Sequence, residues 1–173
     1  MKPYFPMFVD LSHRRALVVG AGRIAARRVK TLAVFCGDIT VVAPEIAPGL
    51  GGPGVTLLQR PFQPSDLEGM DLVLAATDDA ALNAEIAAAC RERGVPVNVS
   101  SDQSLCDFFF PGVAVSGPVV AGVTASGTNH ALARRATEVV REALGGVGGW
   151  EKREQGTGNR NSRLNEPSPS GNL

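Results

Sequence analysis

Long apolar runs are absent from this chain of 173 residues, in which no uninterrupted stretch approaches the ~18 apolar residues that a membrane-spanning helix needs. The first residues also lack the apolar core and the small-residue cleavage site of a signal peptide, since Pro3 and Pro6 break up the apolar patch there. These absences predict a protein with no membrane segment and no secretion signal.

Cysteine is scarce, and an excess of charge of either sign is missing. The three cysteines, Cys36, Cys90 and Cys106, are odd in number and far apart, which argues against a disulfide framework or a cysteine-based zinc site. The 17 Lys and Arg residues balance the 17 Asp and Glu residues, whereas a dedicated nucleic-acid binder carries a basic excess. We therefore expect a cytoplasmic protein with no metal site and no nucleic-acid partner.

The end of the chain has few large apolar side chains. Residues 145–173 contain seven glycines and only four sizeable apolar residues. Such a segment buries too little surface to offset its conformational entropy. Residues 146–173 are therefore predicted to form a disordered tail.

The rest of the chain alternates short apolar runs with helix-like segments. Five runs are predicted to be strands, at Ala16–Gly20, Asp38–Ala43, Val55–Gln59, Leu72–Thr77 and Val95–Val99, and the first has the continuous apolar pattern of a strand buried on both faces. Helices are predicted at Arg23–Phe35 and Ala80–Arg93. This alternation predicts an α/β fold in residues 1–112, with a Rossmann-like, doubly wound parallel sheet.

The pattern changes after the fifth predicted strand. Two short β-like runs on either side of Gly117 predict a hairpin or a sharp turn. An amphipathic helix is predicted at Ala131–Leu144, with Leu132 and Val139 on its apolar stripe. Because residues 113–145 are too few to bury a core alone, we expect this small α+β segment to pack on the first domain or on a second copy of the chain.

The turn after the first predicted strand has the pattern G-x-G-x-x-A. Gly20 would make the tight turn, Gly22 would let the backbone approach a pyrophosphate, and Ala25 would let the helix pack closely on the sheet. The N-terminus of that helix would hold the anion. The motif follows a predicted strand and opens a predicted helix, so it predicts dinucleotide binding; the alternative is no more than a tight turn.

Glu45 is the acidic residue nearest the end of the second predicted strand, 25 residues after Gly20. Its carboxylate could accept hydrogen bonds from an adenosine ribose. No Lys or Arg lies between Lys30 and Arg60 to bind a 2′-phosphate, so NAD is favoured over NADP. The alternative is that Glu45 is only a solvated loop carboxylate.

Polar residues follow the fourth and fifth predicted strands. Ligands of open α/β sheets bind beyond the carboxyl ends of the strands. Thr77 and Asp78 are therefore expected beside the cofactor, and Ser101 and Asp102 are expected to face the substrate. The alternatives are that Asp78 or Asp79 caps the next helix and that the second pair forms a local turn.

The segment before the last helix is rich in small and polar residues. Thr128 or Asn129 is the expected N-cap, and such a helix N-terminus suits a carboxylate or a phosphate. Ser126, His130 and Arg134 are the candidate substrate contacts. The alternative is a capped helix with solvated basic residues.

Five stretches of the chain carry a wider resemblance: YFPMFVDLSHRRALVVGAGRIAARRVKTL, TVVAPE, AATDDAALN, VNVSSDQSLCDFFFP and SGPVVAGVTASGTNHALARR. In this order they resemble the precorrin-2 dehydrogenase family, the dehydrogenase part of siroheme synthases. The resemblance covers about residues 3–145. Its most specific parts are the aromatic-Pro-Met-Phe opening and the strings ATDD-x-x-LN and LCDF-x-FP.

The resemblance implies a Rossmann domain that binds NAD, followed by a segment that builds a homodimer with the substrate in between. By position, the NAD contacts of the family fall on Arg23-Ile24 and Pro44-Glu45. The implied reaction is NAD-dependent oxidation of precorrin-2, a macrocycle with many carboxylate arms, to sirohydrochlorin. Asp102 is then the nearest candidate for the general base.

Two positions depart from the pattern of this family. Ser101 stands where the family usually has the Asp proposed for catalysis or metallation, and Ala125 replaces the second residue of a Ser/Thr pair. Iron insertion must remove two pyrrole protons, for which a hydroxyl is a weak base, so we expect dehydrogenation to survive and iron insertion to be weak or absent. Asp102 is expected to point away from Ser101, as neighbouring residues of a strand do.

Two alternatives to a dehydrogenase stay open from the sequence. One is a non-catalytic NAD-sensing regulatory module, which would share the alternating pattern of the first 100 residues. The other is a catalytically degenerate structural partner, which the departures at Ser101 and Ala125 suggest.

Overall fold

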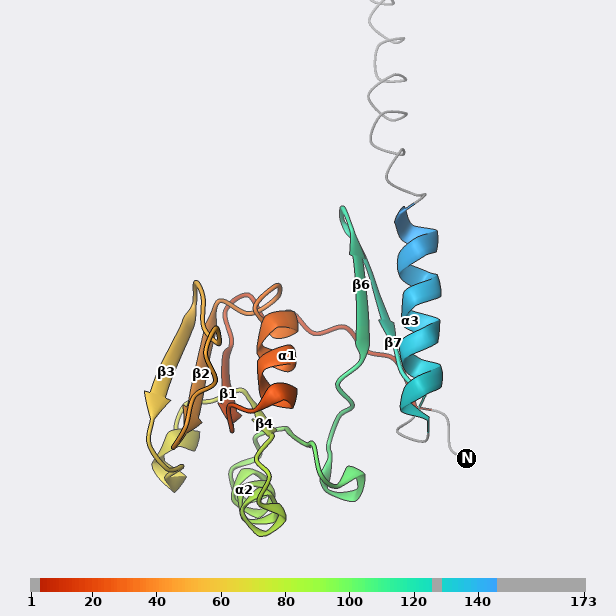
Figure 1. Ribbon diagram of the computed structural model, residues 1–173. Helices are drawn as coiled ribbons and strands as arrows, with labels where there is room; N and C mark the ends of the chain where they lie inside the picture. The colour runs from red at the N-terminus through yellow and green to blue at the C-terminus, as the bar shows by residue number, and fades with distance from the viewer. Residues whose placement is uncertain (1–3, 126–128, 146–173) are drawn as a thin grey trace, which may run out of the picture.

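The computed structural model describes residues 4–125 and 129–145. Its larger part is a parallel sheet with the strand order β3-β2-β1-β4-β5 (Figure 1). The strands are β1 (Arg15–Val19), β2 (Asp38–Ala43), β3 (Val55–Gln59), β4 (Leu72–Ala75) and β5 (Val97–Val99). Because the order reverses between β1 and β4, this is the doubly wound, Rossmann-like sheet that the sequence predicts.

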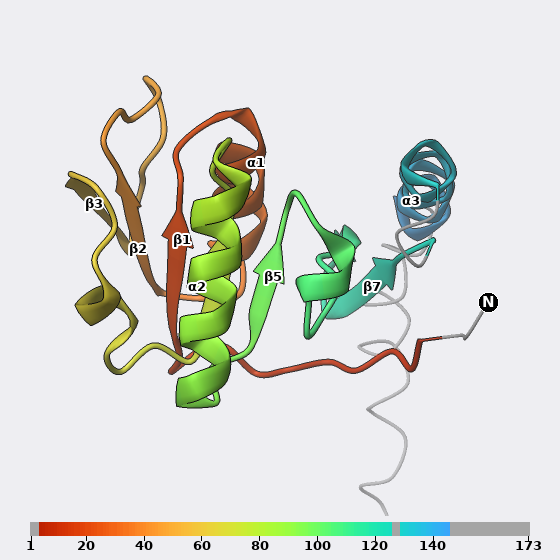
Figure 2. The same ribbon diagram turned by 90° about the horizontal axis from the view of Figure 1, so that it is seen from below.

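Helices cover both faces of this sheet. Residues along each strand alternate between the faces, so Val18 contributes to the apolar layer under α1 (Arg23–Leu32), whereas Leu17 contributes to the layer under α2 (Ala80–Arg93) (Figure 2). Both valine and leucine are fully buried. Burying each such side chain contributes about 1.5–3 kcal/mol, and the two layers therefore fix where the strand ends lie.

The fourth and fifth strands are shorter than the apolar runs that predict them, because polar contacts and a proline limit them. β4 ends at Ala75 because Thr77 N donates to Asn83 Oδ1 (3.2 Å) rather than to a strand. β5 begins only at Val97, since Pro96 has no N–H for the sheet. The first helix is three residues shorter than predicted because its last turn tightens into hydrogen bonds between residues three apart.

The outer edge of β5 is covered by side chains and not by a further strand. After the short helix η2 (Gln103–Leu105), Cys106 Sγ accepts a hydrogen bond from Val99 N (3.1 Å). Asp107 Oδ2 accepts from Val97 N (3.0 Å), and Asp107 N donates to Val97 O (2.9 Å). These contacts satisfy the hydrogen-bonding groups of an otherwise exposed sheet edge, so the LCDF stretch has a structural role here.

A second short helix, η1 (Pro64–Leu67), links β3 to β4.

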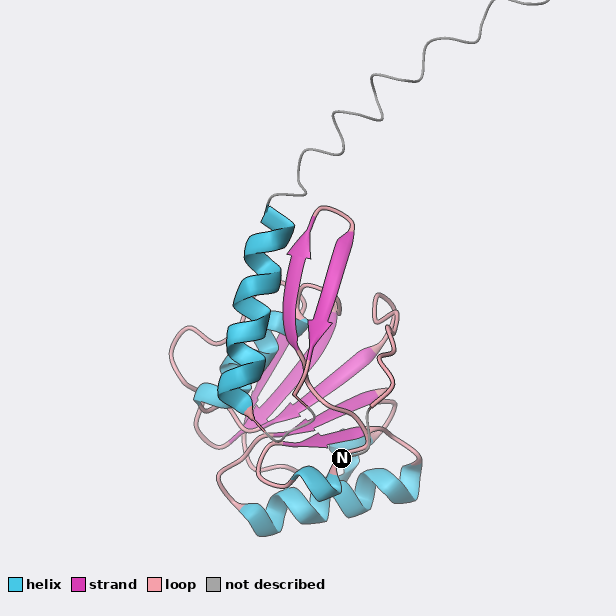
Figure 3. Ribbon diagram, turned by 90° about the vertical axis from the view of Figure 1, so that its right-hand side faces the viewer, coloured by secondary structure: helices cyan, strands magenta, loops and turns pink. Residues whose placement is uncertain are grey.

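A smaller unit follows the sheet. Strands β6 (Gly112–Ser116) and β7 (Val119–Val123) form an antiparallel hairpin, which confirms the predicted hairpin, and α3 (His130–Gly145) lies along it (Figure 3). Thr137 is the buried residue of α3 and lies against Gly112, where a Cβ would not fit. The unit is therefore held together by a close contact between the helix and the first hairpin strand.

Apolar side chains of this unit remain exposed to solvent. Leu132 and Val139 of α3 are 57% and 58% exposed, and Val115 of the hairpin is 46% exposed. Only part of the apolar stripe of α3 therefore packs on the hairpin. The small unit thus has apolar surface beyond what its own packing buries.

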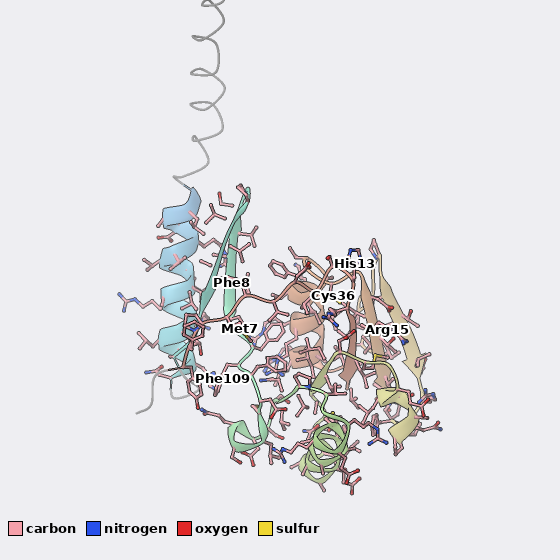
Figure 4. The ribbon with its side chains drawn as sticks, turned by 180° about the vertical axis from the view of Figure 1, so that it is seen from behind. Met7, Phe8, His13, Arg15, Cys36 and Phe109 are labelled. Carbon is pink, nitrogen blue, oxygen red and sulfur yellow. The ribbon has the colours of Figure 1, made fainter. Side chains whose placement is uncertain are left out.

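The N-terminal segment runs from beside the small unit to the first strand of the sheet. It begins beside α3 and crosses to β1, with Met7 and Phe8 along its course (Figure 4). The Tyr4 ring packs on Phe109, with ring centroids 4.4 Å apart, whereas Phe5 is 89% exposed. The aromatic opening of the sequence therefore lies near the small unit and not in the core of the sheet.

Within residues 4–125 and 129–145, no helix is long and apolar enough to cross a membrane. In the same ranges no three His, Cys, Asp or Glu side chains are grouped so that they could hold a metal ion. The predicted disordered tail, residues 146–173, lies outside the described residues, as does Ser126.

Candidate functional site

Gly20 lies where the strand order reverses, between the ends of β1 and β4. Its φ is +104°, and a Cβ at this position would lie 2.5 Å from Ala76 O. Gly20 N donates to Val42 O (2.8 Å), which fixes the turn to the end of β2. Only glycine fits this combination of positive φ and close backbone approach, so the chain turns tightly out of β1 at the switch point of the sheet.

Gly22 leaves open space at the start of α1. Its backbone is extended, and a Cβ there would meet nothing within 4 Å. No side chain caps this end of the helix, and its first turn carries no acidic residue. Ala25 is fully buried, so α1 packs closely on the sheet. The positive end of the helix dipole therefore faces a clear space of the kind that receives a pyrophosphate.

The predicted cofactor contacts of the first two strands come to the same sheet edge. Val19 and Val42 are paired in the parallel register, which places the ends of β1 and β2 side by side. Pro44 and Glu45 follow β2 and are exposed, and Arg23 and Ile24 are exposed in the first turn of α1. These are accessible positions around the clear space, as a bound dinucleotide requires.

Thr77 and Asp78 follow β4 at this edge. The capping role falls on Asp79, whose Oδ1 accepts from Ala81 N (2.9 Å) and Leu82 N (3.0 Å) at the start of α2. Asp78 is exposed at the edge. Asp79 thus caps α2, while Asp78 is exposed to solvent.

Asn83 of α2 connects the ends of β4 and β5 and is not among the predicted site residues. Its Oδ1 accepts from Thr77 N (3.2 Å) and Thr77 Oγ1 (2.8 Å). Its Nδ2 donates to Thr77 O (3.1 Å) and to Ser101 Oγ (3.1 Å). The side chain is fully buried. The available signal was the string ATDD-x-x-LN, in which this amide follows Thr77 by six residues.

Ser101 and Asp102 face different partners, although not for the predicted reason. β5 ends at Val99, so the expected alternation along a strand does not apply to these residues. Ser101 Oγ accepts from Asn83, whereas Asp102 Oδ1 accepts from Ser104 Oγ (2.7 Å) and Ser104 N (2.8 Å) at the start of η2. These two hydrogen bonds from Ser104 hold the pKa of Asp102 below its ordinary value. Asp102 is thus an ionised helix cap and a weakened base.

A cavity of about 670 Å³ lies between α1 and the unit formed by β6, β7 and α3. Its wall is largely apolar, but five basic side chains also line it: Arg27, Arg28, His130, Arg134 and Arg141. Glu138 is the one carboxylate among the lining residues, and its Oε1 lies 4.0 Å from Arg134 Nε. The structure thus brings together two of the predicted substrate residues, His130 and Arg134, and adds three arginines that sequence reasoning missed.

Arg28 is the most desolvated cation of this cavity. Its guanidinium lies 5.5 Å from the centre of the Phe110 ring. Burial lowers the pKa of Arg28, and nearby Cys106 partly offsets this shift. Its buried Nη1 has no hydrogen-bond partner within the described residues. A partly buried guanidinium with a spare donor favours an anionic ligand nearby.

A smaller hollow joins the nucleotide turn to the basic cavity. It has a volume of about 420 Å³ and is lined by Arg23, Ile24 and Arg27. Arg27 also lines the larger cavity. One face of α1 therefore runs from the clear space at Gly22 to the cavity, so a ligand in one would lie next to a ligand in the other.

Three comparisons bear on this geometry. Residues 7–112 match the family model described as "Putative NAD(P)-binding". Among curated proteins, the chain is 39% identical over 145 residues to a siroheme synthase of Sodalis glossinidius, a match that covers 82% of this chain and 30% of the relative. It is 42% identical over 135 residues to a siroheme synthase of Pseudomonas entomophila, covering 76% of this chain and 29% of the relative.

A solved structure shares the fold. It is described as "SirC, precorrin-2 dehydrogenase", with a TM-score of 0.63 and 23% sequence identity, and the match covers 88% of this chain and 76% of that one. The curated relatives are much longer, since this chain spans about 30% of their length. The likeness is thus to one part of those proteins, and it includes both the sheet and the small unit.

Proposed function

The chain belongs to the NAD(P)-binding family whose model covers residues 7–112, and we propose that it oxidises precorrin-2 to sirohydrochlorin with NAD as the hydride acceptor. The observation that carries this proposal is the basic cavity that adjoins the nucleotide turn along α1. A hydride acceptor and a polycarboxylate macrocycle would there lie against each other. The similarity to siroheme synthases and to a precorrin-2 dehydrogenase supports the same reaction.

The residues present fit a dinucleotide. The space beside Gly22 is open, with nothing within 4 Å of where a Cβ would lie, and Gly20 brings the turn onto the end of β4. The backbone at the start of α1 would hold the pyrophosphate, Glu45 would accept from the adenosine ribose, and Thr77 and Asp78 would flank the rest of the cofactor. When bound, NAD supplies the acceptor for the hydride. We propose NAD rather than NADP, because the loop after β2 offers no cation for a 2′-phosphate.

The cavity fits the substrate by charge. Precorrin-2 carries many carboxylate arms, and Arg27, Arg28, Arg134 and Arg141 present guanidinium groups on the wall of the cavity. Each arm that pairs with a guanidinium gains a charge-assisted hydrogen bond. Several such pairs would fix the plane of the ring against the cofactor, and this alignment is the main contribution to hydride transfer.

Proton removal is the second task of the chain. Asp102 is the carboxylate that follows β5 and is the proposed base, and Ser101 would position the substrate or donate a hydrogen bond to it; both lie outside the lining of the basic cavity itself. The hydrogen bonds from Ser104 make Asp102 a weaker base than an ordinary carboxylate. Hydride transfer tolerates a weak base when the ring is well aligned, whereas iron insertion does not.

The assembly belongs to the same proposal. Leu132 and Val139 are exposed on α3, and we propose that a second copy of the chain covers them in a homodimer.

The location is proposed to be the cytoplasm. The cysteines of the described residues are free thiols, which is typical of proteins in a reducing compartment.

The test is a direct assay of the purified chain with precorrin-2 and NAD, followed by NADH absorbance and by the spectrum of sirohydrochlorin. We expect one NADH for each macrocycle oxidised. Arg134→Ala should raise the KM for precorrin-2 about tenfold, the loss of one charge-assisted contact. The control Arg93→Ala, on α2 and away from the cavity, should not. NAD binding without turnover would instead support a NAD-sensing module or a degenerate partner.

A further inference from the structure

Asn83 is a polar residue where the fold would accept an apolar one. It lies on the buried face of α2, one turn before Ile86 and Ala87, and it is fully buried like them. Burying an amide costs free energy unless its groups are hydrogen-bonded. An amide on this face therefore needs hydrogen bonds that offset the free-energy cost of burial. Its hydrogen bonds are to Thr77 and Ser101, which are both residues of the candidate site.

The hydrogen-bonding capacity of the Asn83 side chain is fully used. Its two donors reach Thr77 O and Ser101 Oγ, and its carbonyl oxygen accepts from Thr77 N and Thr77 Oγ1. A primary amide is the side chain that supplies two donors and two acceptor sites in this arrangement. Aspartate keeps the acceptors but loses both donors.

We propose that Asn83 is the positioning residue of this site, which ties the end of β4, where the cofactor would bind, to Ser101 after β5, which is expected to face the substrate. On the cofactor side it fixes the peptide of Thr77, directly after Ala76, whose carbonyl packs against Gly20. On the substrate side it donates to the Ser101 hydroxyl, so the O–H of Ser101 is left as a donor. Asn83 touches neither ligand and acts through these two residues.

The cofactor half of this inference rests on the NAD(P)-binding family, and the substrate half rests on the proposed function. The first readout is therefore NAD affinity, measured by titration of the full chain without precorrin-2. Asn83→Ala releases both groups of Thr77 and should raise the Kd for NAD about tenfold. Asn83→Asp keeps the acceptor for Thr77 N and Oγ1 but loses the donor to Thr77 O, so it should raise this Kd less than Asn83→Ala does.

The second readout is turnover with precorrin-2. Asn83→Asp loses the bond to Ser101 as well as the donor to Thr77 O, so kcat should fall by about tenfold, which is more than the Kd for NAD rises. In a double-mutant cycle, Asn83→Asp should lower kcat little further once Ser101 has been changed to alanine. Additive losses would contradict an action through Ser101.

Cys90→Ala is the matched control for lost stability. Cys90 lies on the same buried face of α2, two turns further on, and it packs in the apolar layer away from Thr77 and Ser101. We expect it to lower the Tm and leave the Kd for NAD unchanged. If Cys90→Ala and Asn83→Ala weaken NAD binding in proportion to their loss of Tm, Asn83 is a structural residue and the inference is wrong.

The outcomes also separate this inference from the proposed function. If the parent chain binds NAD but does not oxidise precorrin-2, the proposed function fails, and the Kd values of the Asn83 variants still decide the cofactor half. If Asn83→Ala does not fold, Asn83→Asp and its cycle with Ser101→Ala decide the inference. An unchanged kcat in Asn83→Asp would overturn it.

Discussion

Ser101 is the residue that would separate two reactions at the proposed site. Its hydroxyl lies at the end of β5 and is held by Asn83 Nδ2 at 3.1 Å. A neutral hydroxyl can orient a substrate but does not take up a proton near neutral pH. The neighbouring carboxylate of Asp102 is bound by Ser104, which keeps its pKa below the ordinary value. Oxidation by hydride transfer needs alignment first, whereas iron insertion needs an acceptor for two pyrrole protons.

Ser101→Asp should therefore gain iron insertion while retaining dehydrogenation. The new carboxylate would stand where Asn83 Nδ2 can donate to it, and a positioned general base contributes about 10²-fold or more to such a step. The measurement is the rate of siroheme formation from sirohydrochlorin and Fe²⁺, with NADH formation followed in parallel. The prediction is contradicted if the parent chain already inserts iron well and Asp102→Ala abolishes it.

The pH dependence of turnover tests Asp102 separately. Its pKa is lowered by the hydrogen bonds from Ser104, so a base at this position stays ionised to a lower pH than an ordinary Asp. If Asp102 is the base, the acid limb of the kcat profile should lie below the range in which an ordinary Asp titrates. Ser104→Ala removes one of these hydrogen bonds and should move that limb upward. A limb that Ser104→Ala leaves in place assigns the proton transfer to another group.

The element proposed to hold the cofactor is the turn between β1 and α1, and its two glycines have different expected tasks. Gly20 is needed for the backbone conformation of the turn, because its positive φ and its approach to Ala76 O exclude any side chain. Gly22 would instead leave room for the ligand, because its backbone conformation suits any residue and nothing lies within 4 Å of where a Cβ would be. Structure and binding are thus separable within three residues of the sequence.

Exchanging each glycine for alanine should show this division. Gly20→Ala forces a rare backbone conformation and a clash, and should cost more than about 2 kcal/mol of unfolding free energy. Gly22→Ala should change stability by less than about 1 kcal/mol but weaken NAD by about tenfold or more, since the methyl group enters the pyrophosphate space. Thermal unfolding and NAD titration of both variants check this. Normal NAD binding by Gly22→Ala would place the pyrophosphate elsewhere.

Elements with a strong local pattern are the ones that the sequence predicts. The apolar runs and the G-x-G-x-x-A turn determine β1, α1 and the switch point, because each depends on residues close together in the chain. The basic cavity was not predictable in the same way. Arg28 and Arg141 come from helices at opposite ends of the sequence and meet only after the small unit has packed beside α1. Likewise, nothing local to Asn83 indicates that Ser101 is its partner.

At the scale of the whole molecule, one apolar region of the small unit has nothing to pack on within the described residues. α3 buries Thr137 against the hairpin but leaves Leu132 and Val139 more than half exposed. These two residues are seven apart and so share one face of the helix. Val115 and the aromatic N-terminal segment add further exposed apolar side chains. Apolar surface concentrated on one element in this way is typical of an interface between subunits.

We therefore predict that the chain is a homodimer at micromolar concentration and that α3 contributes to the interface. Leu132→Glu combined with Val139→Glu places two charges on the exposed stripe and should give a folded monomer by sedimentation velocity, since burying unpaired carboxylates at an interface costs several kcal/mol. Val34→Glu is the matched control, because Val34 is 65% exposed just after α1, in the part of the molecule that carries the sheet. It should leave the dimer intact. A parent chain that sediments as a monomer, or a double variant that remains dimeric, would show that the exposed stripe of α3 is not the contact between subunits.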